Sequence, residues 1–167
     1  MVHVRLARAA DEAALASLDS AAWSSQSGFP SVIQPADGQP AGFFSADNPP
    51  EKHLVAEADD QIVGYVRLKP PTPLRENEHV LQVSGIAVDP AARRRGVATA
   101  LLLAAEQHAR ARNARKITLR VFGSNQPAIR VYRRLGYETE GILREEFFID
   151  GAYVDDILMA KHLRSDG

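Results

Sequence analysis

Short stretches in which hydrophobic and polar residues alternate recur along this chain, and alternation of this kind predicts β-strands. Two of them flank Asp59-Asp60, which indicates a strand pair joined by a tight turn. Near the C-terminus, two longer stretches flank Asp150-Gly151, a strong hairpin signal. The predicted strands cover residues 2–6, 53–58, 61–68, 80–88, 117–121, 141–149 and 152–159.

Hydrophobic residues at helical spacing predict two helices, and proline and glycine signals predict a third. The first covers residues 11–23 and has acidic residues in its first turn, and the second covers residues 96–113. A third helix has Pro127 in its first turn, where proline is tolerated, and stops at Gly136.

Strands and helices alternate in the middle of the chain, and antiparallel pairs stand at both ends. This order predicts an α/β fold: a mixed, mostly antiparallel, twisted sheet with helices on both faces. No repeat and no second domain is visible in the sequence. Residues 1–167 are therefore predicted to form a single domain, which is large enough to build a core without covalent staples.

Residues 24–50 differ in character from the rest of the chain, because they include five prolines and three glycines. A long irregular stretch inside a compact domain is typical of a functional loop or of a partly disordered segment. Its aromatic residues Phe29, Phe43 and Phe44 indicate packing over another part of the molecule. A substrate pocket and plain surface packing are both compatible with this pattern.

Residues 83–98 carry the strongest chemical signal. A β-rich apolar run leads through Asp89-Pro90 into Arg93-Arg94-Arg95-Gly96-Val97-Ala98, which opens a helix. The first N–H groups of a helix have no intrahelical partner, and the helix dipole adds partial positive charge there. Gly96 has no side chain to block the approach of a ligand. The turn therefore suits a phosphate or pyrophosphate, which indicates a phosphorylated cofactor.

Two common phosphate-binding motifs do not fit this turn. A P-loop requires Gly-Lys-Ser/Thr, which does not occur in the chain. The dinucleotide fingerprint requires three glycines and an acidic residue about twenty residues further on, and the turn has too few glycines.

The spacing Arg93-x-x-Gly96-x-Ala98 after a strand resembles the Gln/Arg-x-x-Gly-x-Gly/Ala signature of the GNAT N-acetyltransferases. Those enzymes hold the pyrophosphate of acetyl-CoA at this signature. The resemblance runs from Val4 to Leu163 and so covers nearly the whole chain. Its downstream part follows the order and spacing of the superfamily's second motif with Asn125, Ala128, Tyr132 and Leu135-Gly136-Tyr137.

The resemblance implies an acetyl-CoA-dependent N-acetyltransferase that uses no metal and moves the acetyl group to a primary amine by direct attack in a ternary complex. Backbone N–H groups near Ile86–Val88, in a strand that splays from its neighbour in the family, would polarise the thioester carbonyl. The phosphates would be held chiefly by backbone N–H groups of Arg94–Thr99, with some of the arginine side chains; at least one arginine instead belongs to a solvated helix start. The implied acetyl-CoA-binding residues are Ile86, Ala87, Val88, Arg93, Arg94, Arg95, Gly96, Val97, Ala98, Thr99, Asn125 and Ala128.

Tyr132 is the candidate catalytic residue. A phenol with an ordinary pKa near 10 stays protonated at neutral pH and can donate to a departing thiolate. The alternative is a core aromatic residue whose hydroxyl is bonded to the backbone, and the position of Tyr132 within the motif favours catalysis. Asn125 has two compatible roles: it can hydrogen-bond the cofactor arm or cap the helix.

No general base is assigned. Many members of the resembled family carry a glutamate where Gln82 stands, and an amide can order a water molecule but cannot usefully accept a proton. The histidines are scattered, and we interpret His53 and His79 as surface residues rather than catalysts. Carboxylates lie in a charged loop (Glu76 and Glu78) and on the last hairpin, where we interpret them as a solvated face (Glu145, Glu146, Asp155 and Asp156).

Composition narrows the function classes. The chain has 167 residues, of which 45% are hydrophobic and 25% charged, as is ordinary for a soluble globular protein. It has no cysteine, which excludes disulfides, a thiol nucleophile and a zinc–thiolate site. The absence of a membrane-length apolar stretch and of an export signal predicts a cytoplasmic location. A net charge of −1 argues against nucleic-acid binding.

The acceptor is expected to be a small-molecule amine or a peptide N-terminus. With Gln82 in place of a carboxylate, the site suits an α-amine better than a lysine side chain, because an α-amine is neutral far more often near pH 7.5. We expect the acceptor to enter between the loop at residues 24–50 and the Asp150-Gly151 hairpin.

The final segment resembles the branch that includes ribosomal-protein N-terminal acetyltransferases and small-amine or antibiotic-modifying relatives, through Glu140-Gly141, Arg144, Gly151, Asp155 and Met159. The alternative function is a non-catalytic acyl-CoA-binding or regulatory module. Gln82 favours that alternative, whereas Tyr132 and Asn125 disfavour it. A homodimer is left open.

Overall fold

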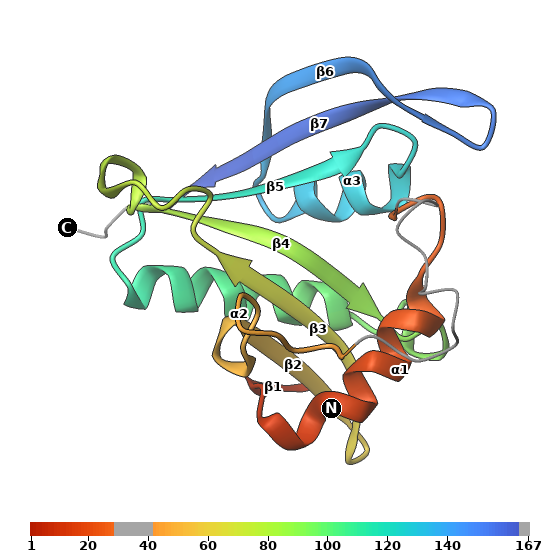
Figure 1. Ribbon diagram of the computed structural model, residues 1–167, viewed down its shortest axis with the longest axis vertical. Helices are drawn as coiled ribbons and strands as arrows, with labels where there is room; N and C mark the ends of the chain where they lie inside the picture. The colour runs from red at the N-terminus through yellow and green to blue at the C-terminus, as the bar shows by residue number, and fades with distance from the viewer. Residues whose placement is uncertain (29–41, 164–167) are drawn as a thin grey trace. The chain divides into compact units, whose positions relative to one another are not determined.

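A computed structural model describes residues 1–28 and 42–163 of the chain (Figure 1). Within these residues, each predicted strand and helix is confirmed, with ends that shift by a few residues. The strands are β1 (His3–Leu6), β2 (His53–Ala58), β3 (Gln61–Lys69), β4 (Val80–Val88), β5 (Lys116–Phe122), β6 (Glu138–Ile149) and β7 (Ala152–His162). The helices are α1 (Glu12–Ala22), α2 (Val97–Ala111) and α3 (Gln126–Arg134).

The strands form one seven-stranded sheet in the order β1-β2-β3-β4-β5-β7-β6. β1 with β2, β2 with β3, β5 with β7 and β6 with β7 are antiparallel, whereas β4 and β5 are parallel. The predicted mixed, mostly antiparallel α/β fold is therefore confirmed.

The described residues fall into two compact units. The first unit contains residues 1–23, 42–68 and 84–105, and the second contains residues 24–28, 69–83 and 106–163. The division passes through β4 and through α2, so each of these two elements contributes to both units.

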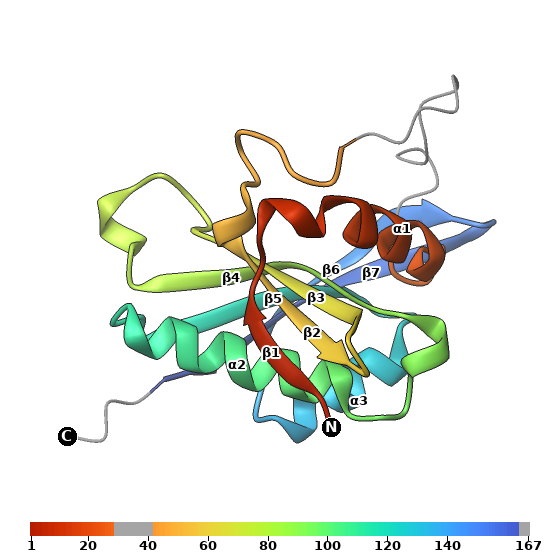
Figure 2. The same cartoon turned by 90° about the horizontal axis from the view of Figure 1, so that it is seen from below.

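In the first unit, the two helices cover opposite faces of β2 and β3 (Figure 2). On one face, Leu15 and Leu18 of α1 pack with Val55 and Tyr65 in a buried cluster. On the other face, α2 lies directly against Gly64. A Cβ atom on Gly64 would lie 2.9 Å from Cγ1 of Val97, which shows how closely the helix approaches the strand.

In the second unit, β5 is the central strand. Val80–Val83 of β4 pair with Lys116–Leu119 on one side, and β7 pairs along the whole of β5 on the other. The predicted hairpin at Asp150-Gly151 is present, and both residues have positive φ (52° and 80°). Two successive residues of this kind form the type I′ turn that suits the twist of paired strands.

Arg5 of β1 links the first unit's N-terminal segment to its sheet. Its Nη1 and Nη2 atoms donate to the two carboxylate oxygens of Asp11 at 2.9 and 3.0 Å, and Nη2 also donates to Oε1 of Glu57 at 2.6 Å. The backbone N–H of Arg8 donates to the same Asp11 carboxylate at 2.7 Å. The hydrogen bonds from Arg5 lower the pKa of Asp11 below its ordinary value of 3.8.

Replacing Asp11 with asparagine is expected to lower the free energy of unfolding by about 1–3 kcal/mol at pH 7. Because the folded pKa is lowered, the wild-type carboxylate stabilises the fold above the unfolded pKa and loses this contribution as the pH falls through the folded value. Urea unfolding at pH 7 and at pH 2 to 3 measures the difference. The difference in the free energy of unfolding between wild type and Asp11→Asn should shrink at acid pH. The control variant Asp150→Asn, in the exposed turn, should stay within about 0.5 kcal/mol of wild type. An equal loss for Asp11→Asn at both pH values contradicts the role of Asp11.

Candidate active site

The turn predicted to bind phosphate joins β4 to α2 in the first unit. The Asp89 side chain caps a short 3-10 turn by accepting from the N–H of Ala91 at 2.9 Å, and the Asp89 N–H donates to the carbonyl of Val63 at 2.8 Å. The chain then passes through Arg94 and Gly96, whose φ values are 65° and 76°. Positive φ at two closely spaced positions bends the backbone sharply into the start of α2.

Gly96 leaves the inside of this turn open. A Cβ atom built on Gly96 would meet nothing within 4 Å. The Gly96 carbonyl accepts from the N–H of Ala100 at 3.0 Å, which is the first hydrogen bond of the helix. The N–H groups from Val97 to Thr99 come before it and therefore have no acceptor within the helix. Free N–H groups around an open glycine match the oxygen atoms of a pyrophosphate, which is the group that the sequence predicts here.

The three arginines of the turn are all exposed. Nη2 of Arg95 lies 3.8 Å from Oδ2 of Asp59 in the turn between β2 and β3. An ion pair of this length between exposed side chains contributes little stability. Arg95 is therefore the arginine that fits the solvated-surface interpretation, whereas Arg93 and Arg94 have no ion-pair partner among the described residues.

Ile86–Val88 form the last residues of β4 and extend past the Val80–Val83 segment that pairs with β5. All three are half-buried. The structure therefore places the predicted thioester-binding backbone immediately before the phosphate turn, in the same unit.

Tyr132 lies on α3 in the second unit and is 7% exposed. Burial raises the pKa of its phenol to about 12, so the hydroxyl stays protonated throughout the physiological range. No described residue forms a hydrogen bond with this hydroxyl. The alternative in which the hydroxyl is bonded to the backbone is thus absent from the described part of the chain.

Asn125 and Ala128 lie at the start of α3. The Asn125 side chain accepts from the N–H of Ala128 at 3.3 Å, which confirms the capping role. Tyr137, whose ring centre is 6.0 Å from that of Tyr132, has a buried hydroxyl without a partner among the described residues. Burial, followed by the nearby Glu106, raises the pKa of Tyr137.

Two sequence interpretations need correction. His53 is not a surface residue: its exposed fraction is 0%, because it lies beneath the rings of Phe43 and Phe44. Asp156 is 2% exposed and accepts hydrogen bonds from Nε and Nη2 of Arg120, so it does not belong to a solvated face. A strand residue that faces a neighbouring layer is buried whatever its polarity, and sequence alone does not show which layer it faces.

Other interpretations fit the structure. His79, Glu76, Glu78, Glu145 and Glu146 are exposed, whereas Gln82 and Asp155 are half-buried. Phe43 of the predicted long loop is buried, and Phe29 lies outside the described residues, as do all residues 29–41 of that loop.

Arg67 of β3 is a candidate site residue that was not predicted from the sequence. Its Nε atom donates to Nε2 of His53 at 2.8 Å, and its guanidinium carbon lies 5.3 Å from the centre of the Phe43 ring. The only sequence signal is that Tyr65 and Arg67 alternate onto one face of a strand, which is too common a pattern to single out a site.

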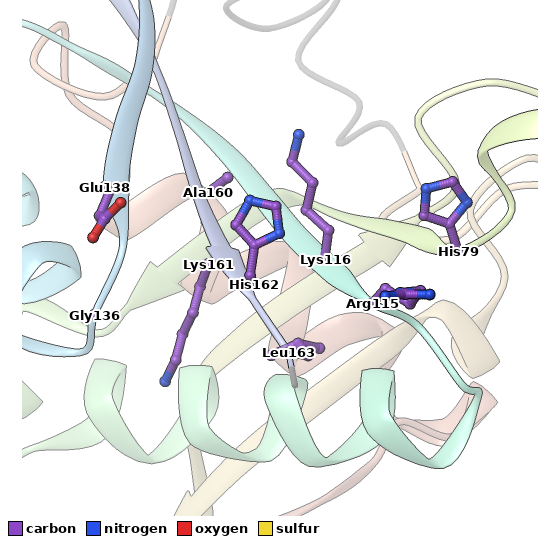
Figure 3. A pocket seen from close by; sticks show the side chains of 9 residues that line it. All are labelled: His79, Arg115, Lys116, Gly136, Glu138, Ala160, Lys161, His162 and Leu163. Atoms are coloured by element: carbon purple, nitrogen blue, oxygen red, sulfur yellow. The ribbon is translucent and has the colours of Figure 1, made fainter. Parts of the chain in front are cut away.

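A separate hollow of about 900 Å³ lies in the second unit (Figure 3). Its cationic side chains are partly engaged, since Lys116 pairs with Glu140 at 2.7 Å and Lys161 with Glu106 at 2.8 Å. None of the predicted site residues lines it. The lining residues are His79, Arg115, Lys116, Gly136, Glu138, Ala160, Lys161, His162 and Leu163.

Two further features are absent from residues 1–28 and 42–163. No group of His, Asp or Glu side chains there has the arrangement of a metal site. No helix in those ranges combines the length and the apolar character needed to span a membrane.

Comparison with known proteins identifies a family and relatives that match more than half of the chain. Residues 14–137 match the model of the acetyltransferase (GNAT) family. The chain is 38% identical over 117 residues to L-amino acid N-acetyltransferase AaaT from Escherichia coli, which covers 70% of this chain and 71% of that protein. It is 39% identical over 101 residues to mycothiol acetyltransferase from Saccharomonospora viridis, which covers 59% of this chain and only 30% of the relative.

A solved structure has the same fold. The structure of an acetyltransferase from Salmonella typhimurium with acetyl-CoA superposes with a TM-score of 0.79 and 18% identity. The match covers 100% of this chain and 96% of that one. At this identity the comparison concerns the fold alone.

We expect the wild-type protein to bind CoA in the micromolar range, and Gly96→Val to weaken that binding at least tenfold, or about 1.4 kcal/mol. A β-branched side chain would fill the open side of the turn. Gly151→Val is the matched control, because Gly151 also has positive φ (80°) and open space around its Cβ position. Both variants should lose stability, and calorimetry should show weaker CoA binding only for Gly96→Val. Unchanged affinity in Gly96→Val would remove the turn from the binding site.

Proposed function

Because the chain belongs to the GNAT acetyltransferase family, we propose that it transfers the acetyl group of acetyl-CoA to a primary amine by direct attack in a ternary complex. The amine nitrogen forms a C–N bond with the thioester carbon, and the C–S bond breaks. One proton leaves the amine and one is taken up by the CoA thiolate. The observation that carries this proposal is the open turn at Gly96, with unpaired N–H groups at the start of α2.

The turn holds acetyl-CoA through its pyrophosphate. Backbone N–H groups of Arg94–Thr99 donate to the phosphate oxygens, and Arg93 and Arg94 add positive charge from side chains without ion-pair partners among the described residues. The N–H groups near Ile86–Val88 donate to the thioester oxygen, which develops negative charge as the amine attacks. Asn125 and Ala128, at the start of α3, contact the pantetheine arm. Residues 1–167 together form one acetyltransferase domain.

Tyr132 donates to the sulfur atom as the C–S bond breaks. Two features of the residue support this role. Its phenol keeps its proton because burial raises the pKa to about 12. Its hydroxyl is also not engaged by any described residue, so it is available to a ligand.

The acceptor is a primary α-amine. Gln82 is half-buried in β4 and supplies no carboxylate there, so the enzyme depends on an amine that is already partly neutral. The carboxylate of a free amino acid raises the pKa of its amine above the value near 8 of a peptide N-terminus. Compared with a lysine ammonium, whose pKa is near 10.4, the peptide N-terminal amine is neutral roughly two hundred times more often at pH 7.5. This ratio corresponds to about 3 kcal/mol, which is comparable to the contribution of a general base.

A non-catalytic acyl-CoA-binding module is the second candidate function. Gln82 favours it, because the amide cannot accept the proton of the amine. The two functions differ in one measurement, since both bind CoA but only the enzyme releases free thiol when acetyl-CoA and an amine are mixed.

We expect Tyr132→Phe to keep CoA affinity and to lower kcat by about 100-fold or more, the scale of a general acid. Tyr137→Phe is the matched control: it removes a neighbouring buried hydroxyl that has no partner among the described residues, and it should keep kcat and thermal stability. Thiol release, CoA calorimetry and melting curves measure the three quantities. If Tyr132→Phe retains full kcat, Tyr132 has no part in the mechanism, and if stability and activity fall together it is a packing residue.

Acceptor preference provides a second test. We expect kcat/KM for an α-amine to exceed that for the side chain of an Nα-blocked lysine at pH 7.5, by about 100-fold for a peptide N-terminus and by about 10-fold for a free amino acid, whose carboxylate raises the amine pKa. Both ratios should narrow as the pH rises toward 9 and above. Thiol release with both acceptors between pH 6.5 and 9 measures this ratio. Faster reaction of the blocked lysine at neutral pH would show that the enzyme has a general base, and the exposed Glu76 and Glu78 would be the first residues to replace.

A further inference from the structure

Within the guanidinium of Arg67, only the Nε atom forms a hydrogen bond with another described residue. Its Nε atom donates to Nε2 of His53 at 2.8 Å, and Nδ1 of His53 lies 2.9 Å from the carbonyl of Pro49. Because a carbonyl only accepts, Nδ1 carries the proton and Nε2 is free to accept from Arg67. Burial lowers the pKa of His53, which keeps the imidazole neutral and suited to this role.

Two aromatic rings lie close to the guanidinium of Arg67. Its central carbon lies 5.3 Å from the centre of the Phe43 ring and 5.9 Å from that of Tyr65. Phe43 is held in turn by the carboxylate of Glu12, which accepts from the backbone N–H groups of Phe43 and Phe44. The cation is therefore oriented before any ligand arrives, which reduces the entropy lost on binding.

The terminal nitrogens of Arg67 remain without an acceptor in residues 1–28 and 42–163. The carboxylate of Asp19 accepts from the Tyr65 hydroxyl at 2.6 Å and forms no ion pair with Arg67. Arg5 and Arg120 differ from Arg67 in this respect, since Arg5 pairs with Asp11 and Glu57, and Arg120 pairs with Asp156. A half-buried guanidinium that is oriented but not neutralised is suited to an external anion, and its planar fork matches a carboxylate.

The Arg67 side chain lies close to the part of β4 that is proposed to bind the thioester. An anion bound by Arg67 would therefore lie close to the reacting atoms. Gly85 of the neighbouring strand β4 lies beside the side chain, since a Cβ atom on Gly85 would be 3.8 Å from Cβ and 3.9 Å from Nη1 of Arg67. Gly85 directly precedes Ile86–Val88, the segment proposed above to hold the thioester. The strands β3 and β4 lie side by side in both views (Figures 1 and 2).

We propose that Arg67 binds the carboxylate of the acceptor through its terminal nitrogens, and that the acceptor is therefore a free α-amino acid rather than a polyamine or a peptide N-terminus. This inference rests on the proposed N-acetyltransferase function. In an α-amino acid the amine and the carboxylate are attached to the same carbon atom. A carboxylate anchored beside Gly85 therefore keeps the amine next to the thioester-binding part of β4.

The experiment compares three acceptors that share one side chain: an amino acid, its carboxamide and the corresponding amine without the carboxyl group. Arg67→Gln should lower kcat/KM for the amino acid by about 10- to 100-fold, the contribution of a charge-assisted hydrogen bond, and mostly through KM. The other two acceptors should change less than about threefold. Because each comparison keeps the same acceptor, differences in amine pKa cancel.

Two further variants complete the design. Arg67→Lys keeps the charge but loses the planar fork, and it should recover only part of the lost kcat/KM. Arg8→Gln removes an exposed arginine of the same unit and should behave as wild type with all three acceptors. CoA calorimetry and melting curves on each variant show whether a loss of activity comes from unfolding or from cofactor binding.

A binding measurement is independent of turnover. Calorimetry should show that the N-acetylated amino acid binds to the CoA complex of the wild type and about 10- to 100-fold more weakly to that of Arg67→Gln. Equal losses for all three acceptors in Arg67→Gln, or equal affinity of the two proteins for the acetylated product, would overturn the role of Arg67. If CoA binds but no amine of any kind is acetylated, the proposed function itself is wrong.

Discussion

The close contact between α2 and Gly64 is the constraint on which the rest of the first unit depends. A Cβ atom at this position would lie 2.9 Å from Val97, 3.0 Å from the carbonyl of Ala87 and 3.0 Å from Leu101. Only glycine allows the helix and the end of β4 to approach β3 this closely. The contact fixes where α2 begins relative to β4, and hence where its unpaired N–H groups point.

Residues of β3 face the proposed cofactor site on one side of the sheet and the proposed acceptor site on the other, because successive side chains of a strand point to opposite faces. Gly64 faces α2, whose first turn is proposed to bind the pyrophosphate of acetyl-CoA. Tyr65 and Arg67 face the α1 side, where aromatic rings orient a cation without neutralising it. Gly64, which contacts α2, and Arg67, which is proposed to bind the acceptor, therefore belong to the same short segment of β3. This shared backbone keeps the two proposed sites at fixed positions along β4.

Much of this arrangement was predictable from the sequence. Alternation, helical spacing and the proline and glycine signals predict every strand and α-helix in the described residues. The motif at Gly96 predicts the tight turn before α2, and phosphate binding there stays a prediction. The cluster around Arg67 was not predictable, because it requires His53 to lie opposite Arg67 in the β2–β3 register and Phe43 to fold over both. The same reason explains the wrong interpretation of His53: its neighbours come from a different strand and from a loop. Asp156 accepts hydrogen bonds from Arg120 of the neighbouring strand β5, a contact that depends on how the strands are arranged rather than on composition.

A crystal structure of the protein with CoA and an N-acetylated α-amino acid tests the account most directly. The account predicts that the pyrophosphate oxygens accept from backbone N–H groups between Arg94 and Thr99. It also predicts that the product carboxylate lies within hydrogen-bond distance of the terminal nitrogens of Arg67. A pyrophosphate bound away from the start of α2, or a carboxylate that leaves Arg67 unpaired, would contradict it.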